Sequence, residues 1–332
     1  LKMSETELQS YSNEEIKNPS IPEKIQEIGK IVETVEEANV ETQLDITSYT
    51  YLELIRTAKE PVDICVVGSN GMYLLFENLQ TDGTRLQILE HRCQRGKNDL
   101  DFGLSPEQAR RGEEIWNFEN WIQNEDKHSG GHGTLSIGDR KAVVDLLQRP
   151  KLKGFEWITT KYKGNEIKTM TPEEMIFEKL RSLARSDVER IPIKWGIDIK
   201  LLKYYIRQID NVPTDDSLDQ LLSKRWEEYL DSQNNQNVMD ILKQKAEGES
   251  YIQLIARITR QPGENLVDFL VQSTGYDRDD VQGLLSCEND DPFIQKYLAL
   301  AKTDKTRMTY AQISEKASNN FSLAMKAINN NS

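Results

Sequence analysis

Three aspartates in the central part of the chain have the types and spacing of a metal site. Asp99 and Asp101 flank one leucine in "KNDLDFGL", and Asp145 lies inside the apolar run "KAVVDLL". Alternate residues of a β-strand share one face, so the first two carboxylates would lie close together. Like charges this close repel each other unless a cation lies between them. With Asp145 on a neighbouring strand, the three would form an oxygen-rich site for a hard divalent ion, above all Mg²⁺.

A turn of small residues in the same region could bind an anion. Gly68 and Ser69 close the β-branched run "VDICVVGSNG", and the helix candidate "MYLLFENL" follows directly. Backbone N–H groups at such a turn can approach an anion, and the helix dipole adds to the attraction. Two divalent ions about 4 Å apart can hold a triphosphate and activate a hydroxyl for in-line attack. The turn and the carboxylates together therefore predict chemistry on a triphosphate.

Each of these features also has a plainer interpretation. A pair of aspartates with one residue between them often caps a turn or faces solvent. A Gly-Ser turn also occurs in ordinary strand-to-helix connections, and Asp145 could lie on an exposed edge strand. His128 and His132 flank "SGG" and could ligate a metal or act as a base, but we interpret both as histidines of a glycine-rich loop.

Regular elements must bring these residues together. We expect helices over residues 1–60, a strand before Gly68 and a strand at 97–104. A helix over 105–128, with Ser105 as N-cap and Pro106 after it, would hold three aromatic core residues, Trp116, Phe118 and Trp121. The segment "TRLQILEHRCQRG" is compatible with a strand or a helix.

The rest of the chain reads as a loop, three strands and then helices. We expect a loop over "KHSGGHGTLSIGDR", a strand at 141–148 and a hairpin that turns at 163–165. Thr171, Pro172 and Glu174 form a helix start with a capping box. From about residue 195 onward every segment predicts helix, with a soft boundary near 212–216.

Composition narrows the class of protein. The chain has 332 residues, is 37% hydrophobic and 29% charged, and carries a net charge of −13. Its apolar runs are far shorter than the roughly 20 residues of a membrane span. The net charge argues against a general nucleic-acid coat but leaves room for a local basic groove. Cys65, Cys93 and Cys287 form no CxxC pair, so we expect neither a zinc site nor a disulfide framework, and we infer a cytoplasmic protein.

Three motifs in this order resemble the nucleotidyltransferase superfamily with the DNA polymerase β-like fold. They are "VVGSNGMYLLF", "KNDLDFGL" and "AVVDLL". The segment "TMTPEEMIFEKLRSLARSDVERIPIKWGIDIKLLKYY" is more closely similar to the AbiEii group, the toxin nucleotidyltransferases of abortive-infection and toxin–antitoxin systems. Lys179 stands at the lysine position of that group, and Arg185, Lys194 and Asp198 match part of its later element.

The resemblance implies a fold and a division of the chain. The fold would be α+β, a small mixed sheet of the nucleotidyltransferase type with flanking helices and a C-terminal helical domain. The parts would be an N-terminal helical segment (1–60), a nucleotidyltransferase-like domain (61–212) and a C-terminal helical domain (213–332).

The resemblance also implies a role for each site residue. Gly68 and Ser69 would hold the triphosphate, and Lys179 would contact it from a helix, unless it is simply a solvated lysine. Asp99 and Asp101 would ligate Mg²⁺ or Mn²⁺. Asp145 would complete the metal site and activate the acceptor hydroxyl.

The implied activity is transfer of a nucleoside monophosphate from ATP, GTP, CTP or UTP to a hydroxyl. The acceptor would be an RNA (tRNA ends being a family precedent), a protein side chain or a small molecule. A toxin role would add an antitoxin partner, and no membrane is implied. The alternatives are a non-catalytic nucleotide-binding or protein-interaction module that keeps the fold, and a helical scaffold in which the aspartate pair is incidental.

Overall fold

The structure is a computed structural model that describes residues 43–77, 79, 99–123, 129–137, 140–186, 193–259, 265–274, 277–287, 289–302 and 307–330. The helices expected before residue 43, the undecided segment 84–96, His128 and Cys93 lie outside these residues. In the described part of the chain, no helix is both long enough and apolar enough to cross a membrane.

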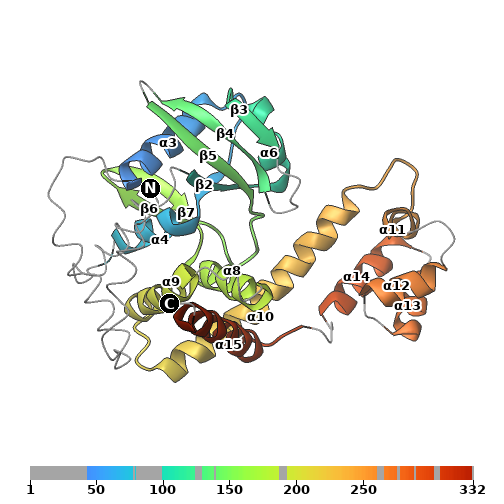
Figure 1. The fold of residues 1–332 in the computed structure, drawn as a ribbon. Helices are drawn as coiled ribbons and strands as arrows, with labels where there is room; N and C mark the ends of the chain where they lie inside the picture. Colours follow the sequence, from blue (N-terminus) through green and yellow to red (C-terminus); the bar gives the residue numbers. More distant parts are fainter. Residues whose placement is uncertain are drawn as a thin grey trace. The chain divides into compact units, whose positions relative to one another are not determined.

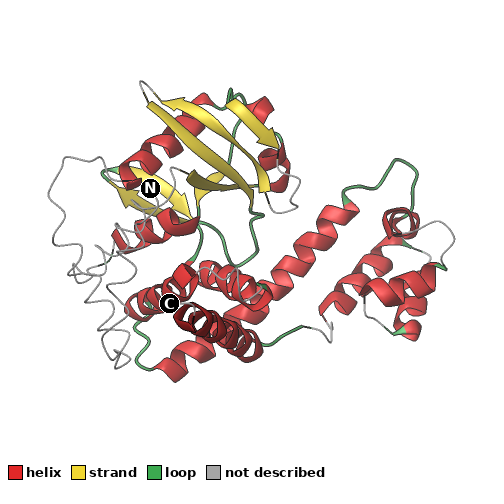
Figure 2. Cartoon of the chain, viewed as in Figure 1, coloured by secondary structure: helices red, strands yellow, loops and turns green. Residues whose placement is uncertain are grey.

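The central part of the chain forms a mixed β-sheet, drawn in yellow in Figure 2. Its strands are β1 (Ile64–Val66), β2 (Asp99–Leu104), β3 (Glu119–Gln123), β4 (Ser129–Ile137), β5 (Arg140–Gln148), β6 (Ile158–Tyr162) and β7 (Asn165–Thr169). Their order across the sheet is β3-β4-β5-β2-β1-β7-β6, and Figure 1 labels each of them except β1. The strands β2 and β5 run parallel, whereas β1 and β4 run antiparallel to these two neighbours. The expected α+β class is confirmed.

The two faces of the sheet differ in burial. Along β5, Ala142, Val144 and Leu146 are buried, whereas the intervening Val143 and Asp145 are half-buried. The buried set packs in one core with residues of helix α3 (Gln43–Thr57), among them Leu54. Burying an aliphatic side chain of this kind stabilises the fold by about 1.5–3 kcal/mol. We call this side of the sheet the packed face and the other side, which is half-buried along β5, the open face.

The expected helix over residues 105–128 is wrong beyond its first turns. Two short helices, α6 (Pro106–Arg110) and α7 (Gly112–Ile115), end at Trp116, whose backbone is extended. The Trp116 indole is buried and donates a hydrogen bond to the carbonyl of Leu54 at 2.7 Å. Burying this large ring in the core requires the chain to leave the helix, and residues 119–123 then form the strand β3.

The expected glycine-rich loop after residue 127 is wrong for residues 129–137, which form β4. A β-carbon on Gly133 would come within 2.8 Å of Phe118, and one on Gly131 would overlap the ring of Trp121. These two rings stack with their centroids 5.1 Å apart. The glycines therefore make room for aromatic packing inside a strand, although their composition is typical of a loop.

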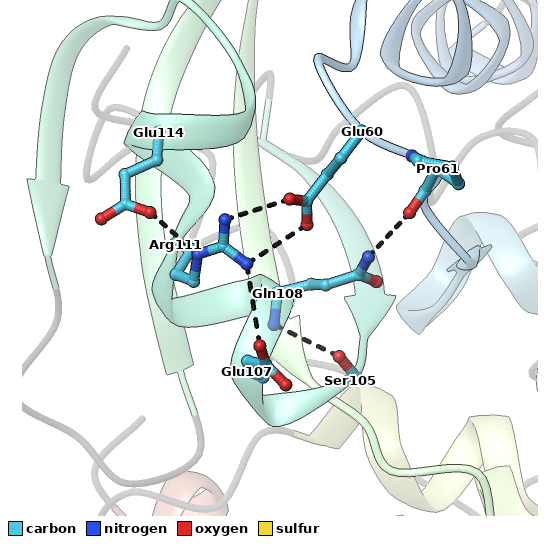
Figure 3. Close-up of polar contacts among 7 residues, drawn as sticks. All are labelled: Glu60, Pro61, Ser105, Glu107, Gln108, Arg111 and Glu114. Atoms are coloured by element: carbon cyan, nitrogen blue, oxygen red, sulfur yellow. Dashed lines mark hydrogen bonds and ion pairs between the residues drawn. The ribbon is translucent and has the colours of Figure 1, made fainter.

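The segment after β2 is held to the start of β1 by polar contacts (Figure 3). Ser105 accepts a hydrogen bond from the backbone N–H of Gln108 at 3.2 Å, which confirms it as an N-cap. The Gln108 side chain donates to the carbonyl of Pro61 at 3.0 Å. The guanidinium of Arg111 lies 3.0 Å from Glu60, 2.8 Å from Glu114 and 3.7 Å from Glu107. These contacts fix the carboxyl end of β2 beside the amino end of β1.

The hairpin and the Thr171 N-cap form as expected, but Oε2 of the buried Glu174 has no hydrogen-bond partner among the described residues and does not complete the predicted capping box. β6 and β7 pair antiparallel around Lys163 and Gly164, which both have positive φ angles. Helix α8 (Pro172–Arg185) follows, with the Thr171 hydroxyl accepting from the Glu174 N–H at 3.3 Å. Helix α9 (Ile193–Ile209) comes next in the chain.

The described chain divides into two compact units. The first holds residues up to Lys151, then Glu156–Val212, and the chain from Ala317 onward. The second holds Leu152–Phe155 and Pro213–Lys316. The later helices, which confirm the predicted helical C-terminal region, are α10 (Asp215–Leu242), α11 (Tyr251–Thr259), α12 (Leu266–Thr274), α13 (Arg278–Leu285), α14 (Asp290–Lys302) and α15 (Tyr310–Asn330).

Candidate functional site

Asp101 and Asp145 are direct neighbours across two parallel strands. In the register of β2 and β5, the Cα atoms of these two residues are partners. Adjacent strands lie about 4.8 Å apart, so side chains at paired positions on one face are neighbours. Both aspartates are half-buried, and Asp145 alternates with the buried residues of the packed face. The two carboxylates therefore share the open face, and because β5 lies between β4 and β2, the edge-strand interpretation of Asp145 is excluded.

Asp99 is the first residue of β2, two positions before Asp101, and its register partner is Val143. Positions two apart in a strand belong to the same face. The side chain of Asp99 lies outside the described side chains, so its predicted role as a metal ligand stays a prediction.

The Gly68 bend lies directly against Asp101. Gly68 has a φ of +66°, and a β-carbon built on it would lie 2.5 Å from Oδ2 of Asp101. The preceding residue, Val67, donates its N–H to the Asp101 carbonyl at 3.1 Å. Only glycine combines this left-handed backbone with such a close approach. The structure thus brings one end of the predicted triphosphate turn to the aspartate pair.

Helix α4 (Gly68–Glu77) begins at this bend, and Ser69 is half-buried in its first turn. The first N–H groups of a helix have no acceptor within the helix and carry the positive end of its dipole. Asn70 is buried in the same turn, and among the described residues its Oδ1 atom has no hydrogen-bond partner. Asn70 is absent from the residues predicted above, and its signal in the sequence is a polar amide directly after Gly68 and Ser69.

The donor atoms at this site suit a hard divalent cation. Asp101 and Asp145 supply carboxylate oxygens, the ligand type that Mg²⁺ and Mn²⁺ prefer. The missing side chain of Gly68 lets Oδ2 of Asp101 approach the backbone at the start of α4. Among the described side chains, no group of three His, Cys, Asp or Glu residues is arranged to hold a metal ion. By ligand type the pair suits such an ion, and position 99 is the third candidate ligand.

Lys179 forms an ion pair that the sequence did not predict. Its Nζ atom lies 2.9 Å from Oδ2 of Asp198, which joins α8 to α9. The Lys179 side chain is 14% exposed and that of Asp198 is 1% exposed, so the interpretation of Lys179 as a solvated lysine is wrong. Arg185 and Lys194, from the same partial motif, are exposed. The predicted contact of Lys179 with a triphosphate stays a prediction.

Two buried ionisable groups lie in the same unit. Glu174 is 3% exposed, and burial, together with Glu178, raises the pKa of its carboxyl to about 8. Among the described residues, its Oε2 atom has no hydrogen-bond partner. Cys65 is fully buried opposite Gly103 of β2, and burial raises the pKa of its thiol.

His132 lies beside the aspartates, contrary to the expected loop. It is the register partner of Asp145 in β4 and is half-buried. The sequence signal was the alternation in "GGHG", in which glycines leave one face of a strand to other residues while the histidine occupies the opposite face.

Comparisons with known proteins give little beyond this geometry. No family model matches the sequence, and no curated protein matches it. Among solved structures, the chain is similar to an antigenic nucleotidyltransferase-like protein from Paracoccidioides brasiliensis. The identity is 15% and the TM-score 0.33, over 55% of this chain and 88% of that one. A likeness of this size carries no argument about activity, so the function is argued from the site alone.

Proposed function

We propose that the chain is a metal-dependent nucleotidyltransferase that moves a nucleoside monophosphate from an NTP to a hydroxyl of an acceptor. The single observation that supports this most is the pairing of Asp101 with Asp145 on the open face, with the Gly68 bend against Asp101. Two negatively charged carboxylates here lie beside the positive end of a helix dipole. The carboxylates attract cations, whereas the N–H groups attract phosphate.

Different residues of the chain would bind the phosphates and the metal ion. The first N–H groups of α4, around Gly68 and Ser69, would bind phosphate oxygens of the NTP. Asp101 and Asp145, with Asp99, would hold Mg²⁺ or Mn²⁺, which supplies charge neutralisation to the phosphates when bound. Lys179 would add a positive charge to the phosphate end of the site.

The transfer step balances without any further reactant. The acceptor oxygen forms a bond to the α-phosphorus while the bond from that phosphorus to the bridging oxygen of the β-phosphate breaks. Pyrophosphate leaves with the electron pair of the broken bond. Asp145 accepts the proton of the attacking hydroxyl, because its carboxylate lies on the open face beside Asp101.

The finer assignment follows from the motifs rather than from the geometry. The segment that contains Thr171, Glu174 and Lys179 resembles the AbiEii group, so a toxin role with an antitoxin partner belongs to the proposal. An RNA acceptor, tRNA included, is the first candidate, and a protein side chain the second. A cytoplasmic setting follows from the absence of a disulfide or zinc pattern among the three cysteines of the sequence.

The test is to incubate the chain with each α-labelled NTP, Mg²⁺ and either total RNA or a cell lysate. We expect label from at least one NTP to appear in one of these pools. Asp101→Asn should lower the transfer at least about 100-fold, the scale of losing one group that stabilises transition-state charge. Glu166→Gln, an exposed carboxylate of β7, is the matched control and should leave the rate unchanged.

One observation favours the non-catalytic alternative, a nucleotide-binding or protein-interaction module. Lys179 already has a carboxylate partner in Asp198, so its charge is partly neutralised. A module of this kind would bind an Mn²⁺–NTP complex and lose it in Asp101→Asn, yet transfer no label. Binding without transfer under every condition above would select this alternative.

A further inference from the structure

Four neighbouring strands carry the site in a fixed order across the sheet. The Gly68 bend follows β1, Asp101 lies on β2, Asp145 on β5 and His132 on β4. Each residue from Asp101 onward is the register partner of the next. The row therefore runs in one direction from the candidate phosphate end of the site to His132.

The side chain of His132 belongs to the open face. Its two neighbours in β4, Gly131 and Gly133, face the rings of Phe118 and Trp121 on the other side of the strand. Alternation along a strand then places His132 on the same face as its partner Asp145. Side chains at directly opposite positions have their β-carbons about 4.5–5.5 Å apart. His132 is thus the direct cross-strand neighbour of Asp145, whose carboxylate would take the acceptor's proton.

The in-line geometry of the proposed reaction indicates which substrate lies at the His132 end of the row. The attacking oxygen and the leaving pyrophosphate lie on opposite sides of the α-phosphorus. If the pyrophosphate lies at the Gly68 end, the hydroxyl must enter from the side of β4. On that side His132 is the first polar side chain past Asp145 in the row, and its register partner in β3 is the exposed, apolar Ile122.

We propose that His132 forms the acceptor side of the site and hydrogen-bonds the molecule that carries the attacking hydroxyl. This inference rests on the proposed nucleotidyltransferase function. An imidazole offers one donor and one acceptor nitrogen, so it can hold a hydroxyl or a neighbouring polar group of the acceptor in place for attack. His132 is then an acceptor-binding residue and has no part in binding the NTP.

The test separates the two substrates kinetically. The probe is whichever pool, total RNA or the protein fraction of a lysate, the unaltered chain labels from an α-labelled NTP. His132→Ala should raise the KM for that pool about 3- to 10-fold, the range of one lost hydrogen bond, and leave the KM for the NTP unchanged. His132→Asn, which keeps a donor and an acceptor, should recover part of the loss. Thr134→Ala, two positions along the same strand and also half-buried, should change neither constant.

The other outcomes of this experiment contradict either the role of His132 or the proposed function. Unchanged constants in His132→Ala overturn this inference and leave the proposed function standing. An equal rise in both constants, or the same rise in Thr134→Ala, assigns His132 a structural role and also overturns it. Retained binding of an Mn²⁺–NTP complex shows that a variant is folded. If the unaltered chain labels neither pool, the proposed function fails, and this inference fails with it.

Discussion

The carboxylate of Asp101 lies against the Cα atom of Gly68, so close that a β-carbon at position 68 would come 2.5 Å from Oδ2. This contact joins the helix N-terminus of α4 to the strand β2. It explains why the bend needs glycine on two counts, the φ of +66° and the missing side chain.

Gly68→Ala should therefore weaken both the fold and nucleotide binding. A left-handed alanine costs about 1–2 kcal/mol of stability, and the displaced Asp101 carboxylate should lower the affinity for an Mn²⁺–NTP complex at least tenfold. Thermal unfolding and titration calorimetry measure the two effects separately.

Gly164→Ala is the matched control for this change. Gly164 also has a positive φ, of +83°, but nothing lies within 4 Å of a β-carbon built on it. It should lose similar stability and keep full nucleotide affinity. Equal affinities in the two alanine variants would show that the contact with Asp101 has no role in binding.

Metal and nucleotide together should stabilise the chain through the aspartate pair. A ligand at 100 times its Kd adds about 2.7 kcal/mol to the free energy of unfolding. We expect a rise of this order in Mg²⁺ with NTP, its loss on adding EDTA, and its absence in Asp145→Asn. Differential scanning fluorimetry with Glu166→Gln as control measures it. A full rise in Asp145→Asn would remove Asp145 from the metal site.

The ion pair of Lys179 and Asp198 should be essential for stability. Removing one partner of a buried pair leaves the other charge uncompensated and lowers the free energy of unfolding by about 3 kcal/mol or more. We expect this loss in Asp198→Asn, and almost none in Lys194→Met, an exposed lysine of α9. Urea unfolding gives the free energies.

A double change separates the structural role of Lys179 from a nucleotide contact. Lys179→Met with Asp198→Leu replaces the pair by apolar side chains and should regain most of the stability lost by the single change. If Lys179 also contacts the triphosphate, the double variant binds the Mn²⁺–NTP complex more weakly than the unaltered chain. Full affinity in a stable double variant would leave Lys179 a purely structural residue.

Glu174 should make stability fall as pH rises. Its folded pKa of about 8 lies above the ordinary value of 4.5, so between these pH values the folded chain holds a proton that the unfolded chain releases. The free energy of unfolding then drops by about 1.4 kcal/mol per pH unit across that window, from this group, and levels off above pH 8.

Glu174→Gln removes this titration. Relative to the unaltered chain, the variant should gain stability steadily from pH 5 to pH 8 in urea unfolding, while Glu166→Gln should follow the unaltered chain throughout. Parallel curves for Glu174→Gln and the unaltered chain would mean that the carboxyl ionises normally in the fold.

The sequence was sufficient where local chemistry decides the structure. Thr171 with Pro172 marks a helix start because a side-chain oxygen and a fixed φ act within one turn. The strand that contains Asp145 is predicted because its neighbours are β-branched and aliphatic. A single carboxylate in such a run must be paired, bound or at a sheet edge. The hairpin around Lys163 and Gly164 follows from the same short-range logic.

The sequence was insufficient where contacts between residues far apart in the chain decide the local structure. The glycines around His132 belong to a strand because Trp121 packs on them, and no local rule reports that contact. Trp116 ends its helix to reach Leu54, which lies 62 residues earlier in the chain. The partner of Lys179 likewise lies on the next helix. As a result the sequence predicts the aspartates of the site, whereas it places in a loop the histidine that the structure has in β4 beside them.

The most direct measurement compares one NTP labelled at the α-phosphate with the same NTP labelled at the γ-phosphate. With Mg²⁺ and the acceptor pool, we expect label in the acceptor from the α-position alone, and no label in the acceptor with Asp145→Asn. Label arriving from the γ-position, or equal α-labelling by Asp145→Asn, would contradict nucleotidyl transfer at this aspartate pair.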